Sequence, residues 1–211
     1  MKTRLFVSAA LGNGVQLTLD GEPARYLGRA LRLRPGDSVA VFNGDGGEWQ
    51  ATIEAFSRNE VVLSVDHALE PISESPLDVH LVQGISRGDR MDTVVQKATE
   101  LGVTRITPVT TNHGMVKFDA RRAERRTEHW HAVATSAAEQ SGRARIPVID
   151  APRALNDWFG EASGSIGNGL VLTPGAGTPM ASRADPAGRL CLLIGPEGGL
   201  SERECDDAIV A

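Results

Sequence analysis

One segment of the sequence has the residue types of a ligand-binding loop. An apolar run of strand type at residues 192–194 leads into Gly195-Pro196-Glu197-Gly198-Gly199, and Ser201 follows as a candidate helix start. Glycines allow positive φ and close approach of a ligand, and free backbone N–H groups can hold its polar edges. Because open α/β sheets bind ligands beyond the carboxyl ends of their strands, the spacing predicts a binding loop. A plain strand-to-helix turn with a solvated Glu197 is an equal alternative from spacing alone.

A second loop of similar composition follows another apolar run. It comprises Leu172, Thr173, Pro174 and Gly175, and ends with a further alanine and glycine. If both runs are parallel strands of one sheet, the two loops share an edge, and this favours a cofactor pocket over a chance turn. Neither loop matches GxGxxG or GxxxxGK[ST], so the sequence supports neither a dinucleotide fold nor a nucleoside triphosphatase.

The remaining candidates for chemistry are weaker. Cys191 lies inside an apolar run and is expected in the core, and Cys205 has no histidine nearby to activate it. His129 and His131 alternate on a predicted helix and so point apart, and no Cys/His spacing suggests a metal site. The polar run Glu-Gln-Ser-Gly-Arg at residues 139–143 differs from an ordinary helix face, because it ends a helix and leads into a turn near the sheet.

Composition excludes several classes of protein. The chain has 211 residues, of which 41% are hydrophobic and 23% charged, so disordered, collagen-like and transmembrane classes are excluded. The N-terminus lacks the apolar region of a signal peptide, and two cysteines agree with a reducing compartment, so we expect a cytoplasmic protein.

The net charge of −5 hides an asymmetry along the chain. Residues 1–70 carry −2 and residues 146–211 carry −5, whereas residues 77–145 carry +3. If a nucleic acid binds, the basic residues to consider first are Arg87, Arg90, Lys117, Arg121, Arg122, Arg125, Arg126, Arg143 and Arg145. For Arg121, Arg122, Arg125 and Arg126, which share one helix face, mere solvation is the favoured interpretation.

Two halves with different patterns must position these residues. From residue 4 to 66, short apolar runs alternate with turn residues, and Asn43-Gly44-Asp45-Gly46-Gly47 is a strong hairpin signal. This pattern predicts a small β-barrel over residues 1–70, interrupted by one helix over residues 24–33 that ends before Pro35-Gly36.

The second half, residues 77–211, follows a polar linker bounded by prolines at residues 71–76. Strand-like runs at 77–83, 103–109, 170–172 and 190–194 alternate with helical patterns at 88–102 and 119–141. Asp119 is positioned to cap the second of these helices, and Ser201 with Glu204 forms a capping box for a last one. Strands alternating with helices predict a mostly parallel α/β sheet.

Four segments, in order, give the chain a family resemblance. They are residues 26–33 (YLGRALRL) with Gly36-Asp37, residues 91–103 (MDTVVQKATELGV), residues 138–143 (AEQSGR) with Ile146-Pro147, and residues 194–199 (IGPEGG). Together they resemble the RsmE-type 16S ribosomal RNA (uridine-N3)-methyltransferases of the SPOUT superfamily. The resemblance covers nearly the whole chain.

The resemblance implies an architecture and a set of roles. A PUA-like β-barrel would contact RNA, and a SPOUT-type α/β domain with a C-terminal trefoil knot would bind S-adenosyl-L-methionine as a homodimer, acting on 16S rRNA or the assembled small subunit. The chemistry of methyl transfer to uracil N3 needs a base or a stabiliser of the uracil anion, so Arg143 would stabilise that anion and Glu197 would accept a proton or hydrogen-bond the base. The implied cofactor residues are Leu172, Thr173, Pro174, Ile194, Gly195, Pro196, Glu197, Gly198, Gly199 and Leu200, and the implied RNA-facing residues are Arg4, Arg29, Arg32, Arg87 and Arg90.

The sequence departs from the family pattern in two places. Residues 111–114 read Thr-Asn-His-Gly, where the family usually has Thr-Glu-Arg. The family also continues past the last helix into a strand and an Arg-Thr-Glu-Thr-Ala-like segment, so we expect a natural protein roughly 30 residues longer and a C-terminally truncated knot here. Two alternatives therefore stay open, an RNA-binding module without methyltransferase activity and an enzyme that binds another anionic ligand at residues 195–199.

Overall fold

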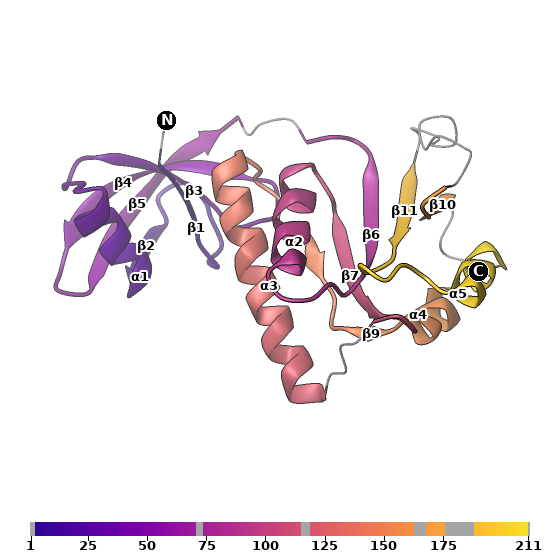
Figure 1. Cartoon of the computed structure of the whole chain (residues 1–211). Coiled ribbons are helices and arrows are strands. Elements are labelled where there is room, and N and C mark those ends of the chain that lie inside the picture. Colours follow the sequence, from indigo (N-terminus) through magenta and orange to yellow (C-terminus); the bar gives the residue numbers. More distant parts are fainter. Residues whose placement is uncertain (1–2, 71–73, 115–118, 163–167, 176–187, 211) are drawn as a thin grey trace. The chain divides into compact units, whose positions relative to one another are not determined.

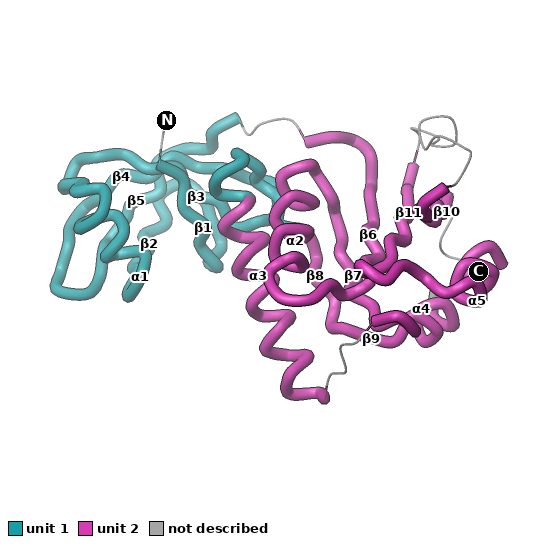
Figure 2. Tube along the Cα trace, in the orientation of Figure 1, with its two compact units in different colours: residues 1–73, 138–146 teal, residues 74–137, 147–211 magenta. Residues whose placement is uncertain are grey.

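The computed structural model describes residues 3–70, 74–114, 119–162, 168–175 and 188–210 (Figure 1). The chain forms two compact units, one of Met1–Ser73 with Ala138–Ile146 and one of Glu74–Ala137 with Pro147–Ala211 (Figure 2). The boundary near residue 73 falls in the predicted linker, of which residues 71–73 lie outside the described part. Sequence reasoning missed the grouping of Ala138–Ile146 with the N-terminal unit.

The N-terminal unit is built on one five-stranded sheet. The strands β1 (Arg4–Phe6), β2 (Gln16–Asp20), β3 (Ser38–Phe42), β4 (Glu48–Phe56) and β5 (Glu60–Leu69) are arranged in the order β1-β3-β4-β5-β2. Only β1 and β3 run parallel, and the other neighbours are antiparallel. The predicted succession of short strands separated by turns is confirmed. Because β1 and β2 are not paired in the described part of the chain, the sheet is a half-barrel.

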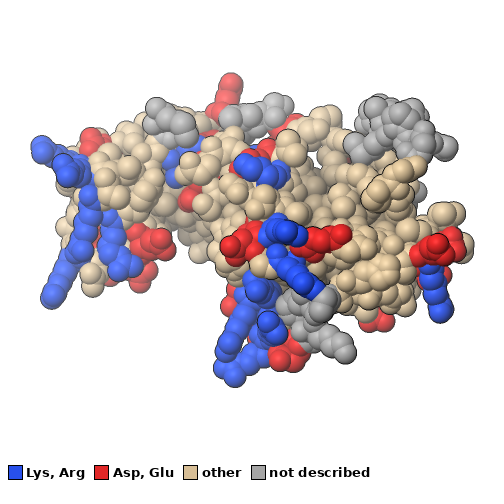
Figure 3. Space-filling view, in the orientation of Figure 1, with Lys and Arg blue, Asp and Glu red and all other residues tan. Residues whose placement is uncertain are grey.

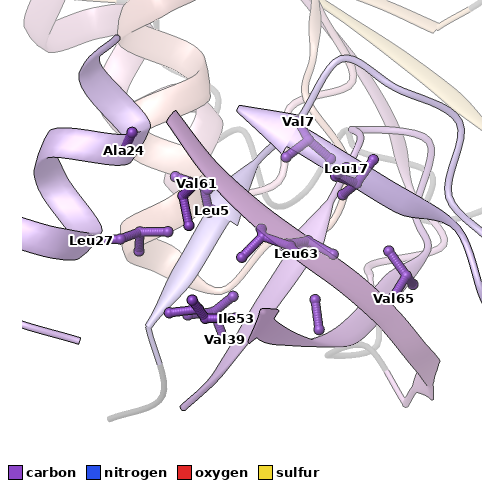
Figure 4. Packing of buried hydrophobic residues seen from close by; sticks show 12 residues of the cluster. Leu5, Val7, Leu17, Ala24, Leu27, Val39, Ile53, Val61, Leu63 and Val65 are labelled. Carbon is purple, nitrogen blue, oxygen red and sulfur yellow. The ribbon is translucent and has the colours of Figure 1, made fainter. Parts of the chain in front are cut away.

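One face of this sheet buries the core of the unit. Alternating apolar residues of the strands meet Ala24 and Leu27 of the helical segment (Figure 4). Leu27, Val39 and Leu63 are fully buried. Burial of a Leu or Val side chain contributes roughly 1.5–3 kcal/mol, so this cluster is the main source of the unit's stability.

The helical segment differs from the prediction in both its bounds and its type. It begins as α1 (Glu22–Arg25) and continues as a π-helix, η1 (Tyr26–Ala30), whereas the pattern predicted a helix over 24–33. The early start follows from a proline in the first turn, which fits only there. The segment ends when the Leu31 N–H reaches back to the Tyr26 carbonyl and Arg32 turns to φ 55°.

The predicted hairpin after β3 is confirmed. Gly44 and Gly46 have φ of 88° and 107°, which glycine adopts without strain. The Asp45 carboxylate accepts the Gly47 N–H at 3.0 Å and closes the turn.

The C-terminal unit is the predicted parallel α/β structure. Strands β6 (Asp78–Gly84), β7 (Arg105–Thr110), β8 (Val148–Ile149), β10 (Asn168–Leu172) and β11 (Arg189–Ile194) form a sheet of order β10-β11-β6-β7-β8, and β9 (Arg153–Ala154) also pairs with β7. All these pairs are parallel. Leu172 pairs with Ile194 and Ile194 with Gln83, so β10, β11 and β6 end at one edge.

Four helices accompany this sheet: α2 (Arg90–Glu100), α3 (Ala120–Ser141), α4 (Leu155–Ala162) and α5 (Glu202–Val210). The Asp119 carboxylate accepts the Arg122 N–H at 2.8 Å, as predicted for the cap of α3. Helix α4 was not predicted, although its apolar residues at positions 155, 158, 159 and 162 follow helical spacing. It buries Leu155 and Trp158 against the sheet and lies beside α5 (Figure 1). None of the helices in the described residues is long and apolar enough to span a membrane.

Candidate functional site

A pocket of about 810 Å³ lies at the carboxyl ends of β10 and β11. The structure brings all ten residues expected at a cofactor site to its lining, from Leu172 to Pro174 and from Ile194 to Leu200. Helix α5 adds Glu202, Cys205 and Asp206, which sequence reasoning missed. The register of the parallel strands accounts for the meeting of the two loops, because Leu172 and Ile194 are direct neighbours.

The conformation of the loop after β11 requires glycine. A Cβ atom on Gly195 would lie 2.8 Å from the Gly199 carbonyl carbon, and one on Gly84 would lie 2.4 Å from Cδ of Pro196. The loop also closes on itself, since the Gly199 N–H donates to the Pro196 carbonyl at 2.8 Å. Side chains are thus excluded where the backbone folds back toward the end of β6.

Buried Gln83 holds this loop against the strand end. Its Nε2 donates to the carbonyl of Gly84 at 2.8 Å and to that of Gly195 at 3.3 Å. A buried amide with satisfied hydrogen bonds fixes a single backbone arrangement, because the unbonded alternative costs about 1–3 kcal/mol. Gln83 is therefore a supporting residue that no sequence motif indicated.

The loop after β7 packs on the other side of the glycine segment. The Asn112 N–H donates to Glu204 Oε1 at 2.7 Å, and Asn112 Nδ2 donates to Ser201 Oγ at 3.1 Å. His113 Nδ1 lies 3.2 Å from the Gly198 carbonyl. The segment that departs from the family pattern is thus in direct contact with the pocket loop.

Glu204 connects the loop after β7 with the start of α5. Its side chain is 3% exposed and accepts hydrogen bonds from the Ser201 N–H and hydroxyl, both at 2.8 Å, as well as from Asn112. The Ser201 hydroxyl is also 3.3 Å from the Glu204 N–H, so the predicted capping box is confirmed. Glu204, which belongs to the capping box of α5, thereby also fixes the loop after β7.

Glu197 is held by the loop that follows β6. Its carboxylate accepts the Arg87 N–H at 3.1 Å and pairs with the Arg90 guanidinium at 2.9 Å. Its own backbone N–H, and then Arg87 and Arg90, lower the pKa of Glu197 below its ordinary value. A carboxylate kept ionised in this way is a weak proton acceptor at neutral pH, which favours a positioning role.

The charge of the pocket distinguishes between ligands. Its lining includes the carboxylates of Glu197, Glu202 and Asp206, and no lysine or arginine among the described residues. Such a lining disfavours phosphate-bearing ligands and fits a ligand with positive charge, such as a sulfonium or ammonium group. Burial raises the pKa of the Cys205 thiol, as do the neighbouring acids, so Cys205 is not an activated nucleophile.

Arg4, expected to face RNA, is instead an internal residue. Its side chain is 12% exposed, and it pairs with Glu48 at 2.9 Å. All five N–H donors are used, two on Glu48 and the others on the carbonyls of Ala138, Glu139 and Arg143. The expectation was wrong because a guanidinium with every donor bonded inside the fold has none for a phosphate.

The segment 138–146 is bound to the N-terminal unit by further contacts. Glu139 Oε1 accepts the Phe6 N–H at 2.8 Å, and the Ile146 N–H donates to the Gly44 carbonyl. Burial raises the pKa of Glu139 despite nearby Arg4. Arg143 is 8% exposed and does not line the pocket, so its expected catalytic role stays a prediction.

The other arginines expected at RNA are accessible. Arg29 and Arg32 are exposed, as are Arg87 and Arg90, although Arg90 is paired with Glu197. Arg121, Arg122 and Arg125 are exposed along α3, Arg126 is half-buried, and Lys117 lies outside the described residues.

Comparisons with known proteins match this architecture. A sequence model of an RNA methyltransferase domain matches residues 73–210, and one of an RNA methyltransferase PUA domain matches residues 19–66. Ribosomal RNA small subunit methyltransferase E of Synechocystis is 30% identical over 99% of this chain and 68% of its own length. The enzyme of the same name from Bacillus subtilis is 28% identical over 90% of this chain and 77% of its own.

Two solved structures are similar over 99% of this chain and 86% of their own. The Neisseria gonorrhoeae ribosomal RNA small subunit methyltransferase E bound to S-adenosyl methionine is 30% identical, with a TM-score of 0.90. A putative methyltransferase from Legionella pneumophila, in complex with the same cofactor, is 34% identical, with a TM-score of 0.90. The chain therefore belongs to the ribosomal RNA small subunit methyltransferase E family, with its PUA-like and SPOUT-type halves.

Proposed function

We propose that this chain transfers a methyl group from S-adenosylmethionine to N3 of a uridine in small-subunit ribosomal RNA. The observation that carries the proposal is the pocket at the ends of β10 and β11, with its glycine-shaped loop and acidic wall. Two relatives of known structure are bound to this cofactor, which supports the assignment.

The residues of the pocket fit the cofactor. The volume of about 810 Å³ lies within the roughly 300–1,000 Å³ of small-molecule pockets. Backbone groups of residues 194–200 would bind its polar edges, and Glu202 with Asp206 would face its positive charges. When bound, S-adenosylmethionine supplies the methyl group.

On the acceptor side, the chain must orient a uracil whose N3 proton passes to solvent water, while N3 takes the methyl group and the cofactor leaves as a neutral thioether. Holding donor and acceptor at attack distance is the larger contribution to an in-line displacement. In this proposal Glu197, fixed by Arg87 and Arg90, orients the pocket loop or accepts a hydrogen bond from the base. Arg143 would stabilise the developing uracil anion.

The partners belong to the same proposal. We infer a homodimer that acts on 16S rRNA or the assembled small subunit in the cytoplasm. Ile209 and Val210, adjacent on α5, are exposed apolar residues that support a protein-protein surface on the C-terminal unit. Light scattering coupled to gel filtration measures the mass in solution, and a monomer would contradict the homodimer.

The decisive assay is methyl transfer to small subunits from a strain that lacks the modification. Labelled S-adenosylmethionine is incubated with the chain and the subunits, and the rRNA is digested and its nucleosides identified by mass spectrometry. We expect N3-methyluridine at one position. Cofactor and rRNA binding without methylated product would contradict the proposal and favour an RNA-binding module.

A further inference from the structure

A second hollow, of about 380 Å³, lies in the N-terminal unit beside its apolar core, to which Ala24, Leu33 and Phe56 of the lining belong. It lies between the helical segment α1–η1 and the turn that joins β4 to β5. Arg25 and Arg29 line it from the helical side, and Phe56, Arg58 and Glu60 from the side of the turn. We refer to this hollow, defined by Arg25, Arg29, Phe56 and Arg58, as the arginine groove.

The arginine groove is positively charged and its guanidinium groups are accessible. Arg25, Arg29 and Arg58 are exposed, and their side chains make no hydrogen bond or ion pair within the described residues. Glu60 is the one carboxylate among its lining residues, which gives three positive charges against one negative. Figure 3 shows basic side chains extending from the end of the molecule where α1 lies.

The distribution of charge makes this end of the unit distinctive. Within residues 3–70, the basic residues are Arg4, which is internal, and five exposed arginines, of which Arg25, Arg29 and Arg58 line the groove and Arg32 and Arg34 do not. The net charge of −2 over residues 1–70 conceals this cluster of arginines, because it sums over the whole segment. A concentrated positive site on an otherwise acidic unit is the electrostatic pattern of a polyanion contact.

The floor of the groove is apolar and aromatic. A Cβ atom on Gly28 would lie 3.1 Å from Cε1 of Phe56, so the ring lies directly against the helical backbone. The backbone is irregular here, since η1 is a π-helix and Arg32 has φ 55°. Both features cost conformational free energy and occur preferentially at functional positions.

We propose that the arginine groove binds one unpaired nucleotide of the substrate rRNA, with its phosphate against Arg25, Arg29 and Arg58 and its base over Phe56. Guanidinium groups bind phosphate, and aromatic rings stack on unpaired bases, which is how proteins recognise looped RNA. The proposal rests on rRNA as the substrate of the proposed function. It adds a specific anchoring site that is separate from the cofactor pocket.

The test compares arginines that line the groove with one that does not. Arg25→Gln, Arg29→Gln, Arg58→Gln and their triple combination are measured against Arg34→Gln, an exposed arginine of the same unit outside the groove. Binding to an unmodified 16S rRNA transcript is followed by fluorescence anisotropy over a range of salt concentrations. Calorimetry with S-adenosylmethionine and thermal unfolding are measured on each variant.

The expected effects follow from release of counterions. Loss of the one phosphate contact in the triple variant lowers the slope of log affinity against log salt by about 0.7 for single-stranded RNA. At about 0.1 M salt this corresponds to roughly fivefold weaker binding for the triple variant, and each single variant should have a smaller effect. Cofactor affinity and the unfolding temperature should match the parent, and Arg34→Gln should change rRNA affinity less than about twofold.

Two results would overturn the proposal. One is a triple variant with the parent's affinity and salt slope. The other is a triple variant that binds the naked transcript normally but binds assembled subunits weakly, because the groove would then contact a ribosomal protein. If the parent binds the transcript through the groove but forms no N3-methyluridine, the proposed function fails and the nucleotide site stands.

Discussion

Gly195→Ala is the smallest substitution that should disturb the cofactor pocket. The added methyl carbon would lie 2.8 Å from the Gly199 carbonyl carbon and 2.9 Å from the Leu200 nitrogen, where ordinary contacts begin near 3.4 Å. Both neighbours are backbone atoms, so the turn itself has to shift, by about 0.5 Å. Overpacking of this kind costs about 1–3 kcal/mol. If that cost falls on the binding conformation, the Kd for S-adenosylmethionine rises about 5- to 150-fold.

The assay is calorimetric titration with S-adenosylmethionine, combined with urea unfolding. Gly160→Ala is the matched control, since its methyl group would meet nothing within 4 Å and it lies inside α4. The control should bind the cofactor like the parent and gain about 0.5–1 kcal/mol of stability from the helical alanine. A Gly195→Ala variant with the parent's Kd and unfolding midpoint would refute the argument that this turn needs glycine.

Three further predictions concern stability. Glu204→Ala leaves two backbone N–H groups without their acceptor and should lower the free energy of unfolding by about 2–5 kcal/mol in urea titrations; a loss below about 1 kcal/mol would show that the β7 loop does not depend on it. Burial lowers the pKa of His80 below 6.5, so the folded state binds fewer protons and the parent should lose stability as pH falls from 7 through 6.5 toward 5. His80→Gln should remove that dependence, and parallel pH profiles of parent and variant would contradict it. Arg4→Met leaves buried Glu48 unpaired and should lower the free energy of unfolding by about 3–5 kcal/mol. An unchanged unfolding midpoint would contradict the internal position of Arg4.

Local patterns predicted most of the elements. The strands of the N-terminal unit follow from alternation of apolar residues, and the hairpin from glycines that accept positive φ. The cap at Asp119 and the capping box at Ser201 are contained within four residues of sequence, so short-range chemistry is sufficient to find them. The meeting of the two Gly/Pro loops follows from parallel strand pairing.

What the sequence could not predict depends on contacts between distant residues. Arg4 is exposed or internal according to whether carbonyls more than 130 residues away accept its N–H groups, and nothing in its neighbours indicates that. The same holds for Gln83 with Gly195 and for Glu204 with Asn112. The π-helix η1 also escaped prediction, because its stability comes from packing of Leu27 rather than from local propensity.

The distribution of charge over the surface of the N-terminal unit could not be predicted from the sequence either. The net charge of residues 1–70 is −2, although three exposed arginines line one groove. Glu60 is the one carboxylate of this segment among the lining residues of the groove, so the sum over the segment says little about the potential at any one place.

A crystal structure of this chain with S-adenosylmethionine is the most direct test of the central claim, that the pocket at β10 and β11 is the cofactor site. We expect density for the adenosyl and methionyl groups against residues 172–174 and 194–200, with Glu202 or Asp206 facing a positively charged group of the ligand. Cofactor bound elsewhere on the chain, or none at concentrations that saturate relatives, would contradict it.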